Sequence, residues 1–192
     1  MYELKTSVEV EQASFSIRNK GDFRMVLDCF EALNDPELSD MEKLYTCLII
    51  FYEDFNDIKD IPHNLIKILQ EEMIRFFNAG EENSSNTHGY RLVDWLKDSN
   101  LICSAINNVA KQEIRALDYL HWWTFLGYYN AIGECALTSI VSIRYKIAKG
   151  EKLDKAEQKF RNDNPEYFNI DLRSREQKEA DDYVDKLWNG GE

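Results

Sequence analysis

The stretch Tyr119-Leu120-His121-Trp122-Trp123-Thr124-Phe125-Leu126-Gly127-Tyr128-Tyr129 holds two of the chain's four tryptophans. Consecutive residues of an α-helix point about 100° apart, so a helix here is apolar around nearly its whole circumference. One interpretation is a central helix buried on all sides. The other is an exposed aromatic groove that anchors a protein partner. Both can hold on different faces, and the candidate contact residues are Trp122, Trp123, Phe125 and Tyr129.

Near the N-terminus, apolar residues alternate with polar ones in two short runs, at Val8, Val10, Phe15 and Ile17. Alternation with a period of two is typical of strands, so these runs predict a small β-hairpin. No other part of the sequence carries a strand pattern.

Three helices are predicted between this hairpin and residue 80. The first opens at Gly21-Asp22 and closes at the turn Asn34-Asp35-Pro36. Ser39 and Glu42 have the spacing of a capping box, which places the start of the second helix. Gly80 is a helix-stopping residue at the end of the third.

The following residues, 81–89, are polar and small, which predicts a linker between two helical halves. A fourth helix is predicted over residues 91–110. The apolar segment 114–148 predicts one long helix or two helices, with Gly127 and Gly133 as the weak points.

Beyond Gly150 the chain becomes rich in charge, and a last helix is predicted over about residues 174–188. The expected fold is therefore mainly α. It comprises a single helical bundle-like domain over residues 1–150, a short N-terminal β-hairpin, and a charged C-terminal helical extension over residues 151–192.

The formal net charge is −12, from 35 acidic and 23 basic residues. Nucleic-acid binders neutralise phosphates with Lys and Arg, so the average field of this chain opposes that function. One basic cluster stands out, formed by Arg144, Lys146, Lys149, Lys152, Lys155 and Lys159. Acidic residues interrupt the cluster, and we interpret it as a solvated helical face.

The four cysteines lie in apolar segments and form no CxxC pair, which predicts buried free thiols in a reducing compartment. The N-terminus lacks the pattern of a signal peptide, and polar residues break every apolar stretch before membrane-spanning length. We expect a cytoplasmic protein without a membrane partner.

No pattern of an enzyme or a metal site is present. The sequence lacks GxSxG, HExxH and glycine-rich phosphate motifs, and no two His or Cys residues have metal-ligand spacing. Asp118 and His121 have helical i, i+3 spacing, but the second such unit that a di-iron bundle needs is missing. We therefore expect no catalytic residues, no bound metal and no cofactor.

The run Leu120–Phe125 (LHWWTF) is followed by Gly133-Glu134 and by Ile140–Arg144 (IVSIR). With these residues the chain resembles the "gene product fifteen" family of bacteriophage proteins. Further matching motifs are Asp22-Phe23-Arg24, Asn34-Asp35-Pro36, Phe76-Phe77 with Gly80, and Asp98 with Leu101-Ile102 and Ser104-Ala105. The resemblance covers most of residues 1–150, and residues 107–111 depart from the family's pattern.

This resemblance implies a non-enzymatic role in tail morphogenesis of tailed phages, in the host bacterial cytoplasm. The leading expectation is a tail assembly chaperone that binds the tape-measure protein, the tail-tube protein or an upstream tail chaperone. An alternative is a structural virion component, such as a connector or tail subunit. A more distant one is an acidic inhibitor of a host defence protein. Whether the chain forms a homo-oligomer is left open.

Overall fold

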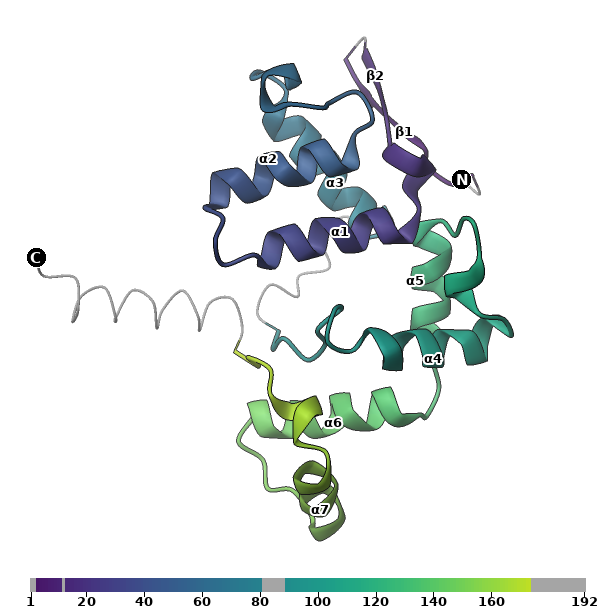
Figure 1. Cartoon of the computed structure of the whole chain (residues 1–192), viewed down its shortest axis with the longest axis vertical. Helices are drawn as coiled ribbons and strands as arrows, with labels where there is room; N and C mark the ends of the chain where they lie inside the picture. The colour runs from purple at the N-terminus through teal and green to yellow at the C-terminus, as the bar shows by residue number, and fades with distance from the viewer. Residues whose placement is uncertain (1–2, 12, 81–88, 174–192) are drawn as a thin grey trace, which may run out of the picture. The chain divides into compact units, whose positions relative to one another are not determined.

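The structure is a computed structural model that describes residues 3–11, 13–80 and 89–173 (Figure 1). Over this part of the chain it contains seven α-helices, four short 3-10 helices and one two-stranded sheet. The predicted mainly α fold with an N-terminal hairpin is confirmed. The helix predicted over residues 174–188 lies outside the described residues, as does the predicted linker apart from Gly89.

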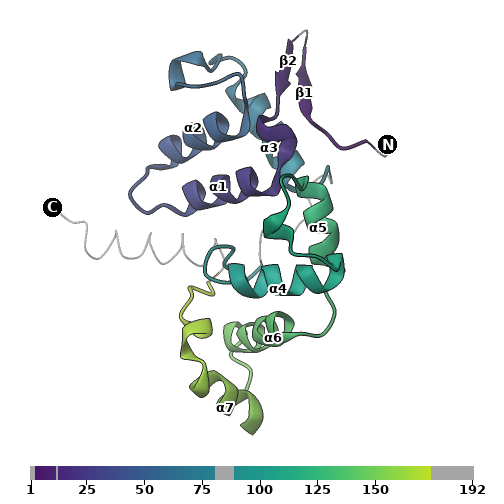
Figure 2. The same ribbon diagram turned by 45° about the vertical axis from the view of Figure 1, so that its right-hand side comes forward.

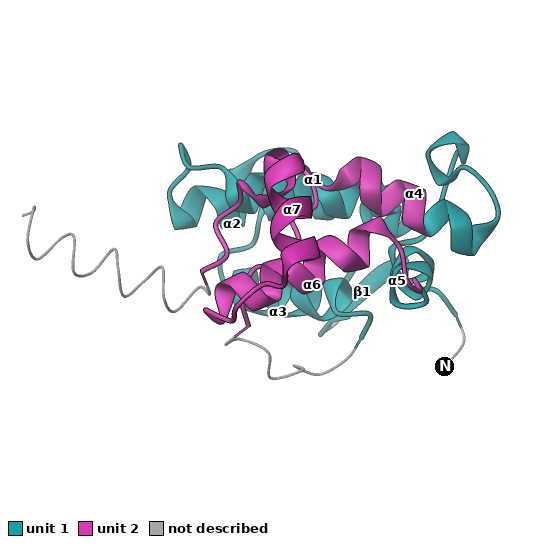
Figure 3. Ribbon diagram, turned by 90° about the horizontal axis from the view of Figure 1, so that it is seen from below, with its two compact units in different colours: residues 1–83, 106–131 teal, residues 84–105, 132–192 magenta. Residues whose placement is uncertain are grey.

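The chain divides into two compact units (Figure 3). Unit 1 comprises residues 1–83 and 106–131, and unit 2 comprises residues 84–105 and 132–192. The polypeptide therefore passes from one unit to the other three times. The predicted boundary at residue 150 stays a prediction.

Unit 1 begins with the hairpin of β1 (Ser7–Val10) and β2 (Ala13–Ser16), which pair antiparallel with Val8 opposite Phe15. Side chains alternate between the two faces of a strand, so Val8, Val10 and Phe15 all point to the same face, and all three are buried. The alternation seen in the sequence is thus the buried face of this hairpin. A 3-10 helix over Arg18–Gly21 connects it to the first α-helix.

Helices α1 (Phe23–Asn34) and α2 (Asp40–Phe51) lie side by side and antiparallel (Figures 1 and 2). Asp22 caps α1 by accepting a hydrogen bond from the backbone N–H of Arg24 at 3.0 Å. The predicted capping box of α2 is confirmed, because the side chains of Ser39 and Glu42 each bond the other's backbone N–H.

Helix α3 (Ile66–Phe77) follows a 3-10 helix over Ile58–Asp60, and α5 (Trp122–Asn130) follows another over Ile114–Ala116. Gly80 has a φ of +82° and donates its N–H to the Arg75 carbonyl at 2.8 Å, which ends α3 as predicted. The core of unit 1 is strongly aromatic. Its fully buried side chains include Phe51, Tyr52, Phe76, Trp122 and Phe125.

In unit 2, α6 (Ala136–Ala148) precedes α7 (Lys155–Asp163) and a 3-10 helix over Pro165–Phe168. Helix α4 (Ser99–Ala110) begins in unit 2 and ends in unit 1. It starts at Ser99 and not at residue 91, so the predicted start was wrong. The predicted apolar segment forms two helices, and its break falls between Asn130 and Ala136, around Gly133. Gly127 lies inside α5.

None of the helices in the described ranges has the length and apolar character needed to span a lipid bilayer.

Candidate protein-binding region

His121 starts α5 and fixes its position. Its Nδ1 accepts a hydrogen bond from the backbone N–H of Trp123 at 3.0 Å, and its Nε2 lies 3.0 Å from the Lys5 carbonyl. An accepting Nδ1 places the ring proton on Nε2, which then donates to Lys5. Burial lowers the pKa of His121, and the Lys5 carbonyl and the Asp22 charge only partly oppose this effect. The ring is therefore neutral at pH 7.

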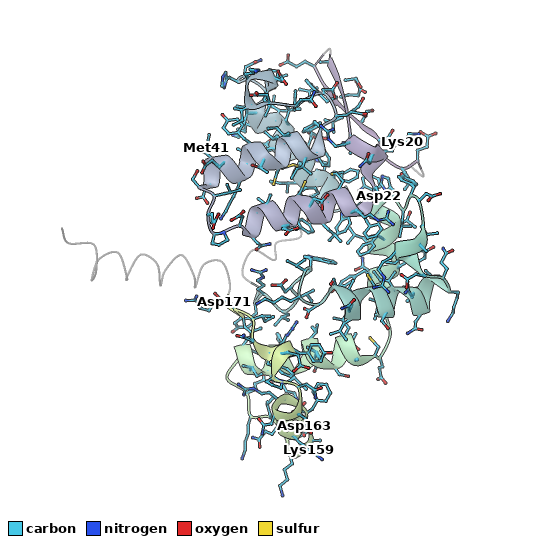
Figure 4. The ribbon with its side chains drawn as sticks, viewed as in Figure 1. Lys20, Asp22, Met41, Lys159, Asp163 and Asp171 are labelled. Carbon is cyan, nitrogen blue, oxygen red and sulfur yellow. The ribbon has the colours of Figure 1, made fainter. Side chains whose placement is uncertain are left out.

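Asp22 joins the start of α1 to the segment before α5 (Figure 4). Its carboxylate accepts the backbone N–H of Leu120 at 2.9 Å and pairs with the Arg24 guanidinium at 3.1 Å. Arg24 also donates to the Leu117 carbonyl at 2.7 Å. Two motifs that lie far apart in the sequence are thus hydrogen-bonded to one another. We refer to Asp22, Arg24 and Leu120–Trp123 together as the aromatic clamp.

Both indoles of the aromatic clamp hold the end of α3. Trp122 donates its Nε1–H to the Phe77 carbonyl at 2.9 Å, and Trp123 donates its Nε1–H to the Phe76 carbonyl at 2.9 Å. The last four carbonyls of an α-helix have no partner within the helix. The two tryptophans therefore cap α3 and satisfy their own polar atoms in the same contacts.

The predicted contact residues divide into two pairs. Trp122 and Phe125 are each 1% exposed, and their rings stack at 5.3 Å between centroids. Phe23 stacks on Phe125 at 4.7 Å, so this pair belongs to the core. Trp123 and Tyr129 are half-buried and keep some accessible surface. That all four contact a partner stays a prediction, and the accessible pair is better placed for it.

Gly21 lies against the aromatic clamp where no side chain would fit. A Cβ at this position would come within 2.6 Å of the Phe76 ring and 3.1 Å of the His121 ring. Its φ is +78°, in the left-handed region that favours glycine. The close approach of this backbone to α3 and α5 therefore depends on glycine.

A second polar centre lies in unit 2 and was missed from the sequence. Arg144 is completely buried and forms a bidentate ion pair with the buried Asp98. Its Nη1 and Nη2 donate to Oδ2 and Oδ1 of Asp98 at 2.6 and 2.9 Å. The prediction that Arg144 belongs to a solvated face was wrong, because the guanidinium points into the unit. The basic residues Lys149, Lys152, Lys155 and Lys159 are exposed as predicted. The available signal was the position of Arg144 directly after Ile143, on the helix whose Ile140 and Ile143 are buried.

The remaining donors of Arg144 bind backbone carbonyls. Nε and Nη2 donate to Tyr167, and Nη1 donates to Leu92 at 2.9 Å. The five guanidinium N–H groups thus make five hydrogen bonds. Asp98 in turn accepts the backbone N–H of Asp94 at 2.9 Å. Such complete satisfaction is what a buried ion pair needs to be tolerated, and it indicates a structural pair.

The other candidate groups are placed as follows. His63 and Asp118 are exposed, and His88 lies outside the described residues. Cys29 and Cys47 are buried free thiols, as predicted, whereas Cys103 and Cys135 are half-buried. In the parts of the chain that the structure describes, no group of three His, Cys, Asp or Glu residues could hold a metal ion.

A protein-family model described as "Bacteriophage Gp15 protein" matches residues 1–167 of the chain. No curated protein and no solved structure shows a significant match. The matched range contains the whole aromatic clamp and both members of the Arg144–Asp98 pair.

Proposed function

Because this chain belongs to the bacteriophage Gp15 family, we propose that it is a non-enzymatic protein of phage tail assembly. In this proposal it acts in the host cytoplasm as a chaperone that binds the tape-measure protein or tail-tube subunits. The observation that carries the proposal is the family match over residues 1–167, which includes the LHWWTF run.

The chemistry of the chain supports a binding role. A net charge of −12 favours solubility of a complex with an aggregation-prone partner. The aromatic clamp fixes α5 at its N-terminal end, so the accessible aromatic surface of Trp123 and Tyr129 is held on a rigid element. Rigid aromatic side chains bind at a low cost in conformational entropy.

The test is co-expression with the tape-measure protein of the same genome, followed by a solubility assay and a tagged pull-down. We expect the tape-measure protein to become soluble and to co-purify. The contact prediction is tested with Tyr129→Ala, and Tyr128→Ala on the same helix serves as the matched control. Trp122 and Phe125 are left unchanged, because replacing either would leave a cavity in the core. A loss of binding could then not be distinguished from a loss of stability.

Mass spectrometry of purified virions separates this proposal from its main alternative. A chaperone is absent from the particle or scarce in it. If the protein instead occurs in the virion at a fixed copy number and does not bind the tape-measure protein, it is a structural component and the chaperone proposal is wrong.

A further inference from the structure

Helices α1 and α2 form a helical hairpin, and the apolar stripe of each continues beyond the core to the end at which the two helices are connected. On α1, Val26 and Cys29 are fully buried, but Leu33 at the end of the same stripe is 42% exposed. On α2, Leu48 is fully buried, and Met41 seven residues earlier is 56% exposed. Residues at these spacings share one face of a helix, so both core-facing stripes emerge at the same end of the hairpin.

Leu33, Met41 and the half-buried Leu38 and Leu44 are together called the hairpin-end patch. Figure 4 places Met41 at the N-terminal end of α2, beside the connection from α1. All four residues belong to unit 1. Binding of a partner that removes this apolar surface from water is expected to be favourable in free energy.

The surroundings of the hairpin-end patch are strongly acidic. Residues 28–44 carry one basic side chain, Lys43, and six acidic ones, Asp28, Glu31, Asp35, Glu37, Asp40 and Glu42. This short segment thus contributes −5 to a chain charge of −12. Partial burial, followed by the negative charges of Glu31 and Asp22, raises the pKa of Asp28. The excess of five negative charges in residues 28–44 favours a cationic partner at the patch.

We propose that the hairpin-end patch binds a cationic amphipathic helix of a partner protein. The apolar face of such a helix covers Leu33 and Met41. Its Lys and Arg side chains pair with the acidic side chains of residues 28–44, which we call the acidic rim. This surface is separate from the accessible aromatics of α5, so the inference names a second contact region and does not rest on the proposed function.

Charge disfavours the two other occupants that the molecule itself could supply. Residues 174–192 carry six acidic and three basic side chains, so this segment has the same sign as the patch. A second copy of the chain brings another −12. Bringing like charges together at an interface is unfavourable, whereas a basic helix is attracted to the acidic side chains around the patch.

The proposal is tested with a fluorescent 18-residue helical peptide of Leu and Lys, patterned so that Leu forms one face. Fluorescence anisotropy measures its affinity for the full chain, for Leu33→Gln/Met41→Gln, and for Ile58→Gln. Ile58 is a matched control, since it is 46% exposed on the 3-10 helix after the opposite end of α2. We expect wild type and Ile58→Gln to bind alike, and the double variant to bind at least about tenfold more weakly.

A second variant, Glu31→Gln/Glu37→Gln, tests the acidic rim. It should weaken binding at low salt, and the difference from wild type should shrink at about 0.5 M NaCl because salt screens exposed charges. Circular dichroism confirms that each variant keeps its helices. A scrambled peptide of the same composition should bind more weakly than the patterned one.

Equal affinity of wild type and the Leu33/Met41 variant would overturn the proposal. So would light scattering that finds a dimer in wild type and a monomer in that variant, because a second copy would then cover the patch. The tape-measure pull-down is a separate measurement, so either proposal can fail alone.

Discussion

The two units place their buried polar groups in different ways. In unit 1, the two indoles and the His121 ring of the aromatic clamp are neutral donors to backbone carbonyls of α3 and of the N-terminal segment. The ion pair of this clamp, Asp22 with Arg24, keeps its guanidinium side chain 40% exposed. In unit 2, a charged pair, Arg144 with Asp98, is removed from water, and its donors also reach the carbonyls of Leu92 and Tyr167.

The two centres differ in the free energy of folding that is lost when one of their side chains is replaced. Loss of the Trp122 indole N–H removes the donor to the Phe77 carbonyl, which costs about 1–3 kcal/mol. A missing guanidinium leaves a buried carboxylate without its counter-charge, which costs about 3–5 kcal/mol. Unit 2 should therefore be the less tolerant of substitution at its polar centre, although unit 1 contains the more conspicuous sequence motif.

The largest effect is expected for Arg144→Leu, which leaves the buried Asp98 carboxylate without a counter-charge. We expect a loss of about 3–5 kcal/mol in the free energy of unfolding, measured by urea denaturation. Hydrogen exchange should accelerate most for amides of unit 2. Adding Asp98→Asn should recover part of the loss, because a neutral amide needs no counter-charge. If the second substitution deepens the loss, the ion pair is not the main cause.

Gly21→Ala tests the close approach at the aromatic clamp. The left-handed backbone costs a non-glycine residue about 1–2 kcal/mol, and the contact of a Cβ with Phe76 adds about 1–3 kcal/mol. Gly80→Ala is the control, since its φ is +82° but its nearest neighbour is 3.8 Å away. Thermal melts should show the larger destabilisation for Gly21→Ala. Equal effects would mean that backbone strain alone matters.

Trp122→Phe removes an indole N–H while keeping an aromatic ring. We expect a loss of about 1–3 kcal/mol, because the Phe77 carbonyl loses its donor and the smaller ring packs less fully. Trp123→Phe should cost less, since Trp123 is half-buried and the Phe76 carbonyl keeps a second donor, the backbone N–H of Ala79 at 3.0 Å. Chemical denaturation followed by circular dichroism compares the two. An equal or greater loss at Trp123 would contradict this ranking.

The smallest effect concerns pH. Burial holds the pKa of His121 below the value of about 6.5 that it has in the unfolded chain. The unfolded state therefore binds the proton more readily, and stability should fall as the pH drops below about 6.5. His121→Asn, which can still cap α5, should flatten this dependence between pH 8 and pH 5 in urea titrations. An unchanged slope would assign the dependence to other groups.

Local signals allowed much of the fold to be predicted. The β-hairpin, the capping box of Ser39 and Glu42, and the helix end at Gly80 all depend on residues close together in the sequence. Each requires a particular backbone geometry or alternation that a few residue types supply. These predictions were confirmed for that reason.

Long-range pairing was the part that the sequence could not supply. Arg144 lies among lysines, and nothing near it in the chain indicates that Asp98, 46 residues earlier, is its partner. The start of α4 was misplaced for a related reason, since Asp94–Asp98 form a turn bonded by these carboxylates. In the aromatic run, both roles were foreseen as alternatives, and burial assigned Trp122 and Phe125 to the core.

The threefold passage of the chain between the units also sets an order of events during synthesis. Helices α1–α3 are complete once residue 77 has been made, but the two indoles that cap α3 come only with Trp122 and Trp123. At about 5–20 residues per second, a ribosome needs about 2–10 s to make residues 78–123. During that interval Phe23 and Phe30 lack the rings of Phe125 and Trp122, against which they pack in the finished protein.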